Sequence, residues 1–166
     1  MKKEVKTNAM RILDRNKLKY TEHMYECDGF TDGITISDRL GQPYEKVFKT
    51  LVTVSKSKKY YVFVVPVAEE LNLKKAAAAV GEKSVEMIYV KDITAITGYV
   101  RGGCSPIGMK KQYPTFIEET ATLYDEIAVS AGARGNQIIM NPEDLIQYIN
   151  MIVCDLAEQK GKSHAV

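Results

Sequence analysis

The chain has 166 residues, of which 45% are hydrophobic and 27% charged, and this composition excludes disordered, collagen-like and coiled-coil chains. Its 23 basic and 21 acidic residues leave a net charge of +2, which excludes strong non-specific binding of nucleic acid but allows a local basic patch. The length predicts one domain, residues 1–158, followed by a polar tail at residues 159–166.

Export and membrane insertion are not expected. The longest apolar run, residues 60–68, is far shorter than the roughly 18 residues that cross a bilayer. The basic start of the chain lacks the apolar stretch of a secretory signal. Three widely spaced cysteines form neither a disulfide framework nor a C-x-x-C motif. We therefore expect a cytoplasmic protein with no membrane partner.

The first half of the chain shows helical and strand periodicity in turn. Apolar residues recur at helical spacing near the start, and a polar turn at residues 55–58 separates two β-rich runs that are expected to form a hairpin ended by Pro66. The expected elements are a helix from Val5 to Leu13, a strand at 19–26, a short helix at 37–40 ending at Gly41, strands at 47–54 and 60–65, and a helix from 73 to 80 between Asn72 and Gly81.

The second half adds three strands and a final helix. Asn141 is a suitable N-cap, and Pro142 suits the first helical position. The expected elements are a helix at 91–97 closed by Gly98, strands at 116–119, 126–130 and 137–140, and the helix after Asn141. Because strands cluster rather than alternate with helices, the pattern favours a single α+β domain with a mixed sheet.

Six of the eleven glycines lie in two short segments, residues 98–111 and 130–136. Glycine lets the backbone approach a ligand, and exposed N–H groups in such turns can bind an anion or an oxyanion. Both segments also carry cations, namely Arg101, Lys110, Lys111 and Arg134. Two ordinary turns with solvated charges are the alternative. A phosphate-binding loop is excluded, because the residues after Gly108 do not match and Pro106 removes a donor.

Lys49 lies within a β-rich run, on the same strand face as Val47 and Leu51. A lysine there either protects an exposed sheet edge or points as a cation into a pocket, and the pattern alone favours the exposed edge.

The sequence offers no obvious protein nucleophile or metal site. His23 and Cys27 are too few ligands for zinc, and Cys104 has no evident base beside it. We expect no cofactor. An enzyme of this kind would depend on positioning and on backbone electrostatics.

Four segments together resemble the YbaK/EbsC family in order and spacing. They are Val47–Val52, Leu73–Ala77, Gly98–Gly108 and Val129–Gly135. Members of this family are stand-alone bacterial Cys-tRNA(Pro)/Cys-tRNA(Cys) deacylases, similar to the editing domain inserted in bacterial prolyl-tRNA synthetases. The resemblance spans about residues 5–155. It implies a mixed, partly barrel-like sheet with flanking helices, and removal of misattached cysteine from Cys-tRNA(Pro), with Cys-tRNA(Cys) as a further substrate.

The resemblance also implies roles for individual residues. Lys49 would hold the terminal adenosine, and N–H groups near Gly102 and Gly103 would stabilise the oxyanion, while the substrate's own thiol attacks its carbonyl. On this account Cys104 is a bystander. The expected catalytic residues are Lys49, Gly102 and Gly103. The expected substrate-binding residues are Tyr20, Phe48, Thr50, Tyr99, Ser105, Pro106, Gly108, Ser130, Gly132, Arg134 and Gly135.

One residue departs from the family pattern, since Ala131 stands where glycine is expected. Alanine would be strained there if the position needs a positive φ. The implied partners are the acceptor end of tRNA and, transiently, prolyl-tRNA synthetase. Two alternatives stay open: a deacylase of Ala-tRNA(Pro) that uses water as nucleophile, and a module that binds tRNA ends or nucleotides without chemistry.

Overall fold

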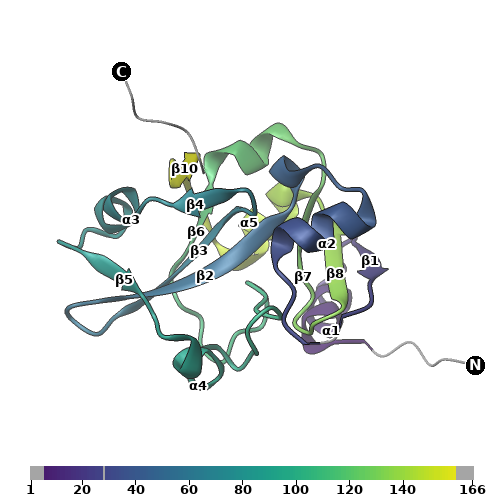
Figure 1. The fold of residues 1–166 in the computed structure, drawn as a ribbon, viewed down its shortest axis with the longest axis horizontal. Helices are drawn as coiled ribbons and strands as arrows, with labels where there is room; N and C mark the ends of the chain where they lie inside the picture. The colour runs from purple at the N-terminus through teal and green to yellow at the C-terminus, as the bar shows by residue number, and fades with distance from the viewer. Residues whose placement is uncertain (1–5, 28, 160–166) are drawn as a thin grey trace, which may run out of the picture.

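Two β-sheets form the centre of the computed structural model, which describes residues 6–27 and 29–159 (Figure 1). The larger sheet has the strand order β5-β2-β3-β6-β9 and consists of Val85–Met87, Phe48–Ser55, Tyr60–Pro66, Thr115–Glu118 and Ile152–Cys154. Strands β5, β2 and β3 are antiparallel, whereas β3, β6 and β9 run parallel. The sheet is therefore mixed, as predicted, but it is open and does not close into a barrel.

The smaller sheet has the order β1-β8-β7 and is antiparallel, with strands Thr21–Met24, Asn136–Met140 and Ile127–Ser130. A parallel bridge between Val47 and Ala128 links it to the start of β2. A separate pair joins β4 (Glu69–Leu71) to β10 (Ala157–Gln159). Gln159 thus ends a strand, while residues 160–166, the rest of the predicted tail, lie outside the described residues.

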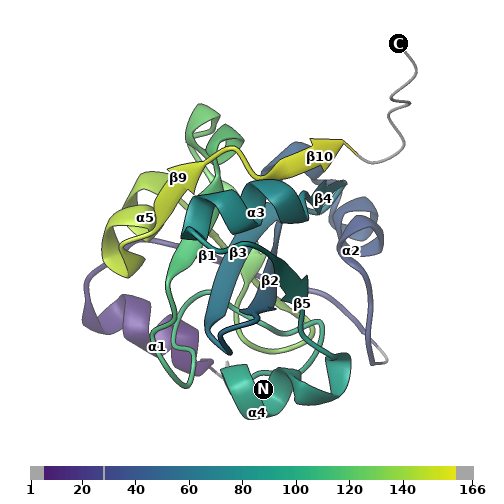
Figure 2. The ribbon, with the colours of Figure 1, turned by 90° about the vertical axis from the view of Figure 1, so that its left-hand side faces the viewer.

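Helices cover both faces of the larger sheet. Helix α3 (Leu73–Val80) lies over β2 and β3 on one face (Figure 2). On the other face, α1 (Asn8–Arg15) and α5 (Pro142–Ile149) pack on a core that includes Phe48, Val64 and Ile117. Strand β3 serves both cores: Phe63 and Val65 face α3, and Val64 faces α1 and α5. This arrangement confirms the predicted α+β class.

The helix ends show which local signals were sufficient. Asn72 accepts a hydrogen bond from the Lys75 N–H, and Gly81 ends α3 with φ +74°, as predicted. Asn141 likewise caps α5 ahead of Pro142. Helix α2 (Gly33–Leu40) is longer than predicted, because the Asp32 carboxylate accepts the Thr35 N–H and starts the helix four residues earlier.

Several boundaries differ from the prediction. The predicted helix at 91–97 is a 3₁₀ turn (Val90–Asp92) followed by α4 (Ile93–Thr97). Further 3₁₀ turns occupy Tyr44–Lys46 and Glu119–Leu123. Helix α1 begins after the cap residue Thr7, and Val5 lies outside the described residues. The short strands β4, β5, β9 and β10 were not predicted. In the part of the chain that the structure describes, no helix has the length and apolar character needed to cross a bilayer.

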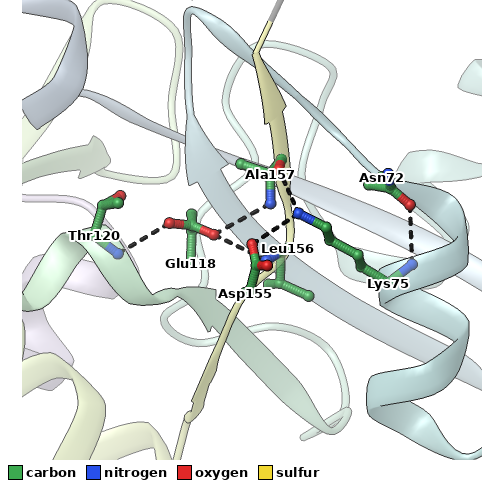
Figure 3. A network of polar contacts seen from close by, with 7 residues as sticks. All are labelled: Asn72, Lys75, Glu118, Thr120, Asp155, Leu156 and Ala157. Atoms are coloured by element: carbon green, nitrogen blue, oxygen red, sulfur yellow. Dashed lines mark hydrogen bonds and ion pairs between the residues drawn. The ribbon is translucent and has the colours of Figure 1, made fainter. Parts of the chain in front are cut away.

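The C-terminal strands are held in place by a buried carboxylate (Figure 3). Glu118, at the end of β6, accepts N–H hydrogen bonds from Thr120, Leu156 and Ala157. Beside it, the Lys75 ammonium of α3 pairs with the Asp155 carboxylate at 3.0 Å, and this contact raises the pKa of Lys75. The network joins α3, β6 and the segment that leads into β10.

Candidate active site

A cavity of about 510 Å³ lies beside the first half of β2. Its size is within the range of sites for small ligands. The walls come from β2, α2, the turn after Val100, the end of β7, the start of β8, and the segment from β5 to α4. The lining residues are Tyr25, Phe30–Ile34, Ile36, Val47–Val52, Val67, Met87, Ile88, Val90, Ile93, Arg101, Gly102, Cys104, Val129, Ser130, Asn136 and Gln137.

Lys49 lines this cavity from β2 and is half-buried. It pairs with Val65 of β3 on one side. On the other side β5 pairs only with Thr53–Ser55, so no strand of the larger sheet covers β2 at Lys49. The position of Lys49 therefore combines features of both interpretations, the lysine of a strand edge and the cation of a pocket. Lys49 lies where β2 has no partner from the larger sheet on that side, and this part of β2 forms a wall of the cavity.

The two glycine-rich segments form turns that pack against each other. In the first turn the Gly103 N–H donates to the Val100 carbonyl, and in the second the Asn136 N–H donates to the Ala133 carbonyl. Each turn has an Arg-Gly pair at its centre, and both central glycines, Gly102 and Gly135, have positive φ, as the type II turn requires. The Arg134 guanidinium bridges the turns by donating from Nε to the Arg101 carbonyl at 2.7 Å.

The two predicted oxyanion donors, Gly102 and Gly103, differ in how their backbone N–H groups are used. Gly102 lines the cavity, and its N–H donates no hydrogen bond within the described residues. The Gly103 N–H is already used in its turn, and Gly103 is buried. A Cβ at Gly103 would lie 3.1 Å from the Arg134 nitrogen and 3.2 Å from the Ala133 carbonyl carbon. Gly103 thus allows the close approach of the second turn, and of the two glycines only Gly102 lines the cavity.

Ala131 does not strain the second turn. Its φ is not among the positive values, whereas the next residue, Gly132, has φ +98° and lies where a Cβ would meet the Tyr99 ring at 2.9 Å. The expected departure from the family pattern therefore falls on a position that accepts alanine, and Ala131 is fully buried.

The other residues expected at the site fall into two groups. Phe48, Thr50 and Ser130 line the cavity, and the buried Thr50 hydroxyl has no hydrogen-bond partner within the described residues. The residues behind the wall are Tyr99, Ser105, Pro106, Gly108, Gly132, Arg134 and Gly135, which do not line the cavity.

Some of these residues have visible structural partners. The Tyr99 hydroxyl donates to the Ile107 carbonyl, and the Ser105 hydroxyl accepts the Ile107 N–H. Tyr20 lies apart from the cavity, in a shallow depression beside β8, where its hydroxyl donates to Asp14 of α1 at 3.0 Å.

Sequence reasoning missed two walls of the cavity. Phe30 and the residues of α2 form one, and Met87 to Ile93 form the other. The Arg101 guanidinium lies 4.0 Å from the centre of the Phe30 ring. Neither segment carries a motif, so only the fold brings them to the site.

No lining group whose pKa shift is resolved is poised to act as a general base near neutral pH. The Thr35 backbone N–H lowers the pKa of Asp32, and burial raises the pKa of Tyr25. Burial raises the pKa of Cys104 to about 11, which keeps this thiol protonated and weakly nucleophilic. Among residues 6–27 and 29–159, no group of three His, Cys, Asp or Glu side chains could hold a metal ion.

Known proteins resemble this chain in sequence and in fold. A family model described as an aminoacyl-tRNA editing domain matches residues 35–148. A relative from Enterococcus faecalis, named "Putative Cys-tRNA(Pro)/Cys-tRNA(Cys) deacylase EbsC", is 46% identical over 150 residues, which is 90% of this chain and 92% of the relative.

Two solved structures share the fold at lower identity. One, described as the "Crystal structure of a putative trans-editing enzyme for prolyl tRNA synthetase", has a TM-score of 0.78 and 23% identity, over 93% of this chain and 99% of that one. The other, hypothetical protein APE2540, has a TM-score of 0.82 and 17% identity, over 89% and 97% of the two chains. The family match and the 46% identical relative together show that this chain belongs to the aminoacyl-tRNA editing domain family.

Proposed function

We propose that the protein is a trans-editing deacylase that removes cysteine from mischarged Cys-tRNA(Pro), with Cys-tRNA(Cys) as a further substrate. The observation that carries the proposal is the meeting of Lys49 and Gly102 in the lining of one cavity, a cation and a residue whose backbone N–H is not used in its turn. The name of the 46% identical relative supports the same activity.

In the proposed complex the terminal adenosine and its cysteinyl ester occupy the cavity. The Lys49 ammonium holds a phosphate or hydroxyl oxygen of the adenosine and so fixes the pose of the ester. The Gly102 N–H points to the ester carbonyl and stabilises the negative charge that develops on its oxygen. This division agrees with the use of the Gly103 N–H inside its own turn.

The nucleophile is the thiol of the substrate. Its sulfur attacks the carbonyl carbon of the same cysteine, so that a carbon–sulfur bond forms and the bond to the ribose oxygen breaks. The ribose oxygen leaves and takes up a proton, which balances the proton lost by the thiol. The products are a cyclic cysteine thiolactone and tRNA with a free end. A thiol suits this cavity because it is partly ionised near neutral pH without a protein base.

Such an activity would correct errors that prolyl-tRNA synthetase makes when it selects its amino acid. Cysteine and proline are close in size, and a binding pocket discriminates poorly between substrates that differ by so little. An editing site that depends on the thiol removes the cysteine that the amino-acid pocket of the synthetase accepts. We place this work in the cytoplasm, with tRNA as partner. A transient complex with prolyl-tRNA synthetase would raise the local concentration of a substrate that a +2 chain binds weakly.

Deacylation assays test the proposal directly. Purified protein is incubated with Cys-tRNA(Pro), Ser-tRNA(Pro) and Ala-tRNA(Pro), and the product is identified by mass spectrometry. We expect loss of cysteine alone, with thiolactone as product. Lys49→Ala should lower kcat/KM by roughly 10²- to 10³-fold. Lys56→Ala, on the exposed turn of the same hairpin, is the matched control and should leave it unchanged.

Other outcomes would select the alternatives. Release of alanine and serine as well as cysteine would require water as the nucleophile and would exclude the thiol mechanism. Binding of tRNA without turnover of any aminoacyl-tRNA would leave a non-catalytic module.

A further inference from the structure

The mouth of the cavity is marked by residues that line it and are also exposed. Phe30, Asp32 and Arg101 form one group of them, and Met87 and Val90 form the other. The second group belongs to the segment from β5 to α4 (Figure 1). Apolar side chains are thus left uncovered where a ligand would enter.

Tyr89 lies in the segment from β5 to α4 but does not line the cavity. Its neighbours in the chain, Ile88 and Val90, both do. Consecutive Cα atoms are about 3.8 Å apart, so the backbone of Tyr89 borders the lining of the cavity. Tyr89 is 74% exposed, the same exposure as Leu123 and more than any other exposed aromatic side chain of the described chain. The Lys91 ammonium lies 5.6 Å from the centre of the Tyr89 ring.

A second pair of cation and ring belongs to the first group. The Arg101 guanidinium lies over Phe30, and Arg134 fixes the Arg101 backbone. Aromatic rings flanked by cations are what single-stranded nucleic acid needs, because bases stack on the rings and phosphates pair with the cations. The net charge of only +2 means that such contacts must be local.

We propose that Tyr89 and Lys91 bind the nucleotide that precedes the terminal adenosine, with the Tyr89 ring stacked on its base and Lys91 beside its phosphate. This inference rests on the proposed function, which puts the terminal adenosine in the cavity. The chain of the substrate must then leave through the mouth, and Tyr89 is the most exposed ring in the segments that border it. Tyr89 is a positioning residue, because it touches neither the ester nor the adenosine.

The test compares substrates that contain or lack the preceding nucleotide. Wild type, Tyr89→Ala and Tyr89→Phe are assayed on Cys-tRNA(Pro), on the cysteinylated trinucleotide CCA and on cysteinyl-adenosine. We expect Tyr89→Ala to raise KM on the order of tenfold for the first two, with kcat nearly unchanged, since one stacked base is lost. With cysteinyl-adenosine the change should be below about twofold. Tyr89→Phe keeps the stacking surface and should behave as wild type.

Tyr148→Ala is the matched control, because Tyr148 is also exposed, at 40%, but lies on α5 and away from the cavity lining. It should change no KM. Equal KM values for Tyr89→Ala and wild type on Cys-tRNA(Pro) would overturn the inference. So would an equal loss on all three substrates, which would put Tyr89 at the terminal adenosine or in folding.

A binding measurement keeps the inference separate from the proposed function. Fluorescence anisotropy of a labelled, uncharged RNA hairpin ending in CCA gives Kd without any turnover. A Kd roughly tenfold higher for Tyr89→Ala than for wild type supports stacking of a base on Tyr89, even if wild type deacylates nothing. Equal Kd values would reject it, and the exposed ring would then be a surface for a protein partner.

Discussion

Gly103 illustrates how a single residue sets the geometry of the candidate site. Its missing side chain lets the backbone of Ala133 and Arg134 approach, and the Arg134 guanidinium then reaches the Arg101 carbonyl. The turn that carries Gly102 is held in place by this contact. Gly103 therefore helps to set the position of Gly102, the proposed oxyanion donor.

Replacement of Gly103 by alanine should damage both stability and activity. The new Cβ meets backbone atoms, which cannot move aside as a flexible side chain would. We expect the free energy of unfolding to fall by about 1–3 kcal/mol, and kcat/KM for Cys-tRNA(Pro) to fall by at least tenfold. Urea unfolding and single-turnover deacylation measure the two effects.

Gly81→Ala supplies the control for this prediction. Gly81 ends α3 with φ +74° and has open space around its Cβ position, so alanine there costs about 1–2 kcal/mol of backbone strain away from the cavity. If Gly103→Ala lost stability but kept full activity, the second turn would not position Gly102.

At the scale of an element, α2 shows how tight packing sets a wall of the cavity. Gly33, Ile34 and Ile36 of this helix line the cavity. Its first residue, Gly33, lies so close to the residue that follows β3 that a Cβ there would be 2.4 Å from Val67 Cγ1. At the other end, Gln42 and Gln137 exchange amide hydrogen bonds at 2.6 and 3.1 Å, which ties the end of α2 to β8.

Gly33→Ala should therefore destabilise the protein, although alanine favours helix by up to about 1 kcal/mol over glycine. The φ of Gly33 is not positive, so the effect comes from overlap with Val67, at a cost of about 1–3 kcal/mol. We expect a lower free energy of unfolding in urea and a raised KM. The double variant with Val67→Ala should recover part of both.

A comparison within the same helix separates packing from backbone strain. Gly41→Ala at the end of α2 meets no atom within 4 Å and should leave KM unchanged. A Gly33→Ala variant more stable than wild type would show that α2 is not held against Val67.

For the whole molecule, Glu118 is the point where the C-terminal strands attach to the centre of the fold (Figure 3). Its carboxylate is only 3% exposed and accepts all three of the N–H groups described above. The segment that it holds leads to β10, which pairs with β4, and β4 directly follows the Val67 wall of the cavity. Attachment of the C-terminal segment and the shape of the cavity are thus linked.

Glu118→Gln should destabilise the whole fold rather than one end of it. Both carboxylate oxygens of Glu118 accept N–H groups, whereas a glutamine amide has only one acceptor oxygen. Its NH₂ group would therefore face a buried N–H donor. We expect the free energy of unfolding to fall by about 2–4 kcal/mol. Urea unfolding monitored by circular dichroism measures this loss. Asp155→Asn removes only the partly exposed pair with Lys75 and should cost less than about 1 kcal/mol. Equal losses in the two variants would contradict this assignment.

The sequence by itself determined the local structure wherever a residue type has a specific backbone role, such as starting or ending a helix. Asn72 and Asn141 begin helices because their side chains accept backbone N–H groups, and Gly81 ends one because it adopts positive φ. The alternation around Lys49 and the turn at residues 55–58 were sufficient for the hairpin of β2 and β3. The strands of three residues escaped prediction, because so short a segment shows no periodicity and depends on its partner strand.

Only the tertiary structure decided how these parts form a cavity. It put Lys49 in a wall of the cavity, where no strand of the larger sheet pairs with β2 on that side, whereas strand periodicity alone favoured a plain exposed edge. It put Gly102 in the lining of the cavity and used the N–H of Gly103 in a turn, which glycine content cannot distinguish. It also brought Phe30 and the neighbours of Tyr89 to the cavity. The physical reason is that caps and turns depend on neighbours in the chain, whereas cavity walls depend on contacts between segments far apart in sequence.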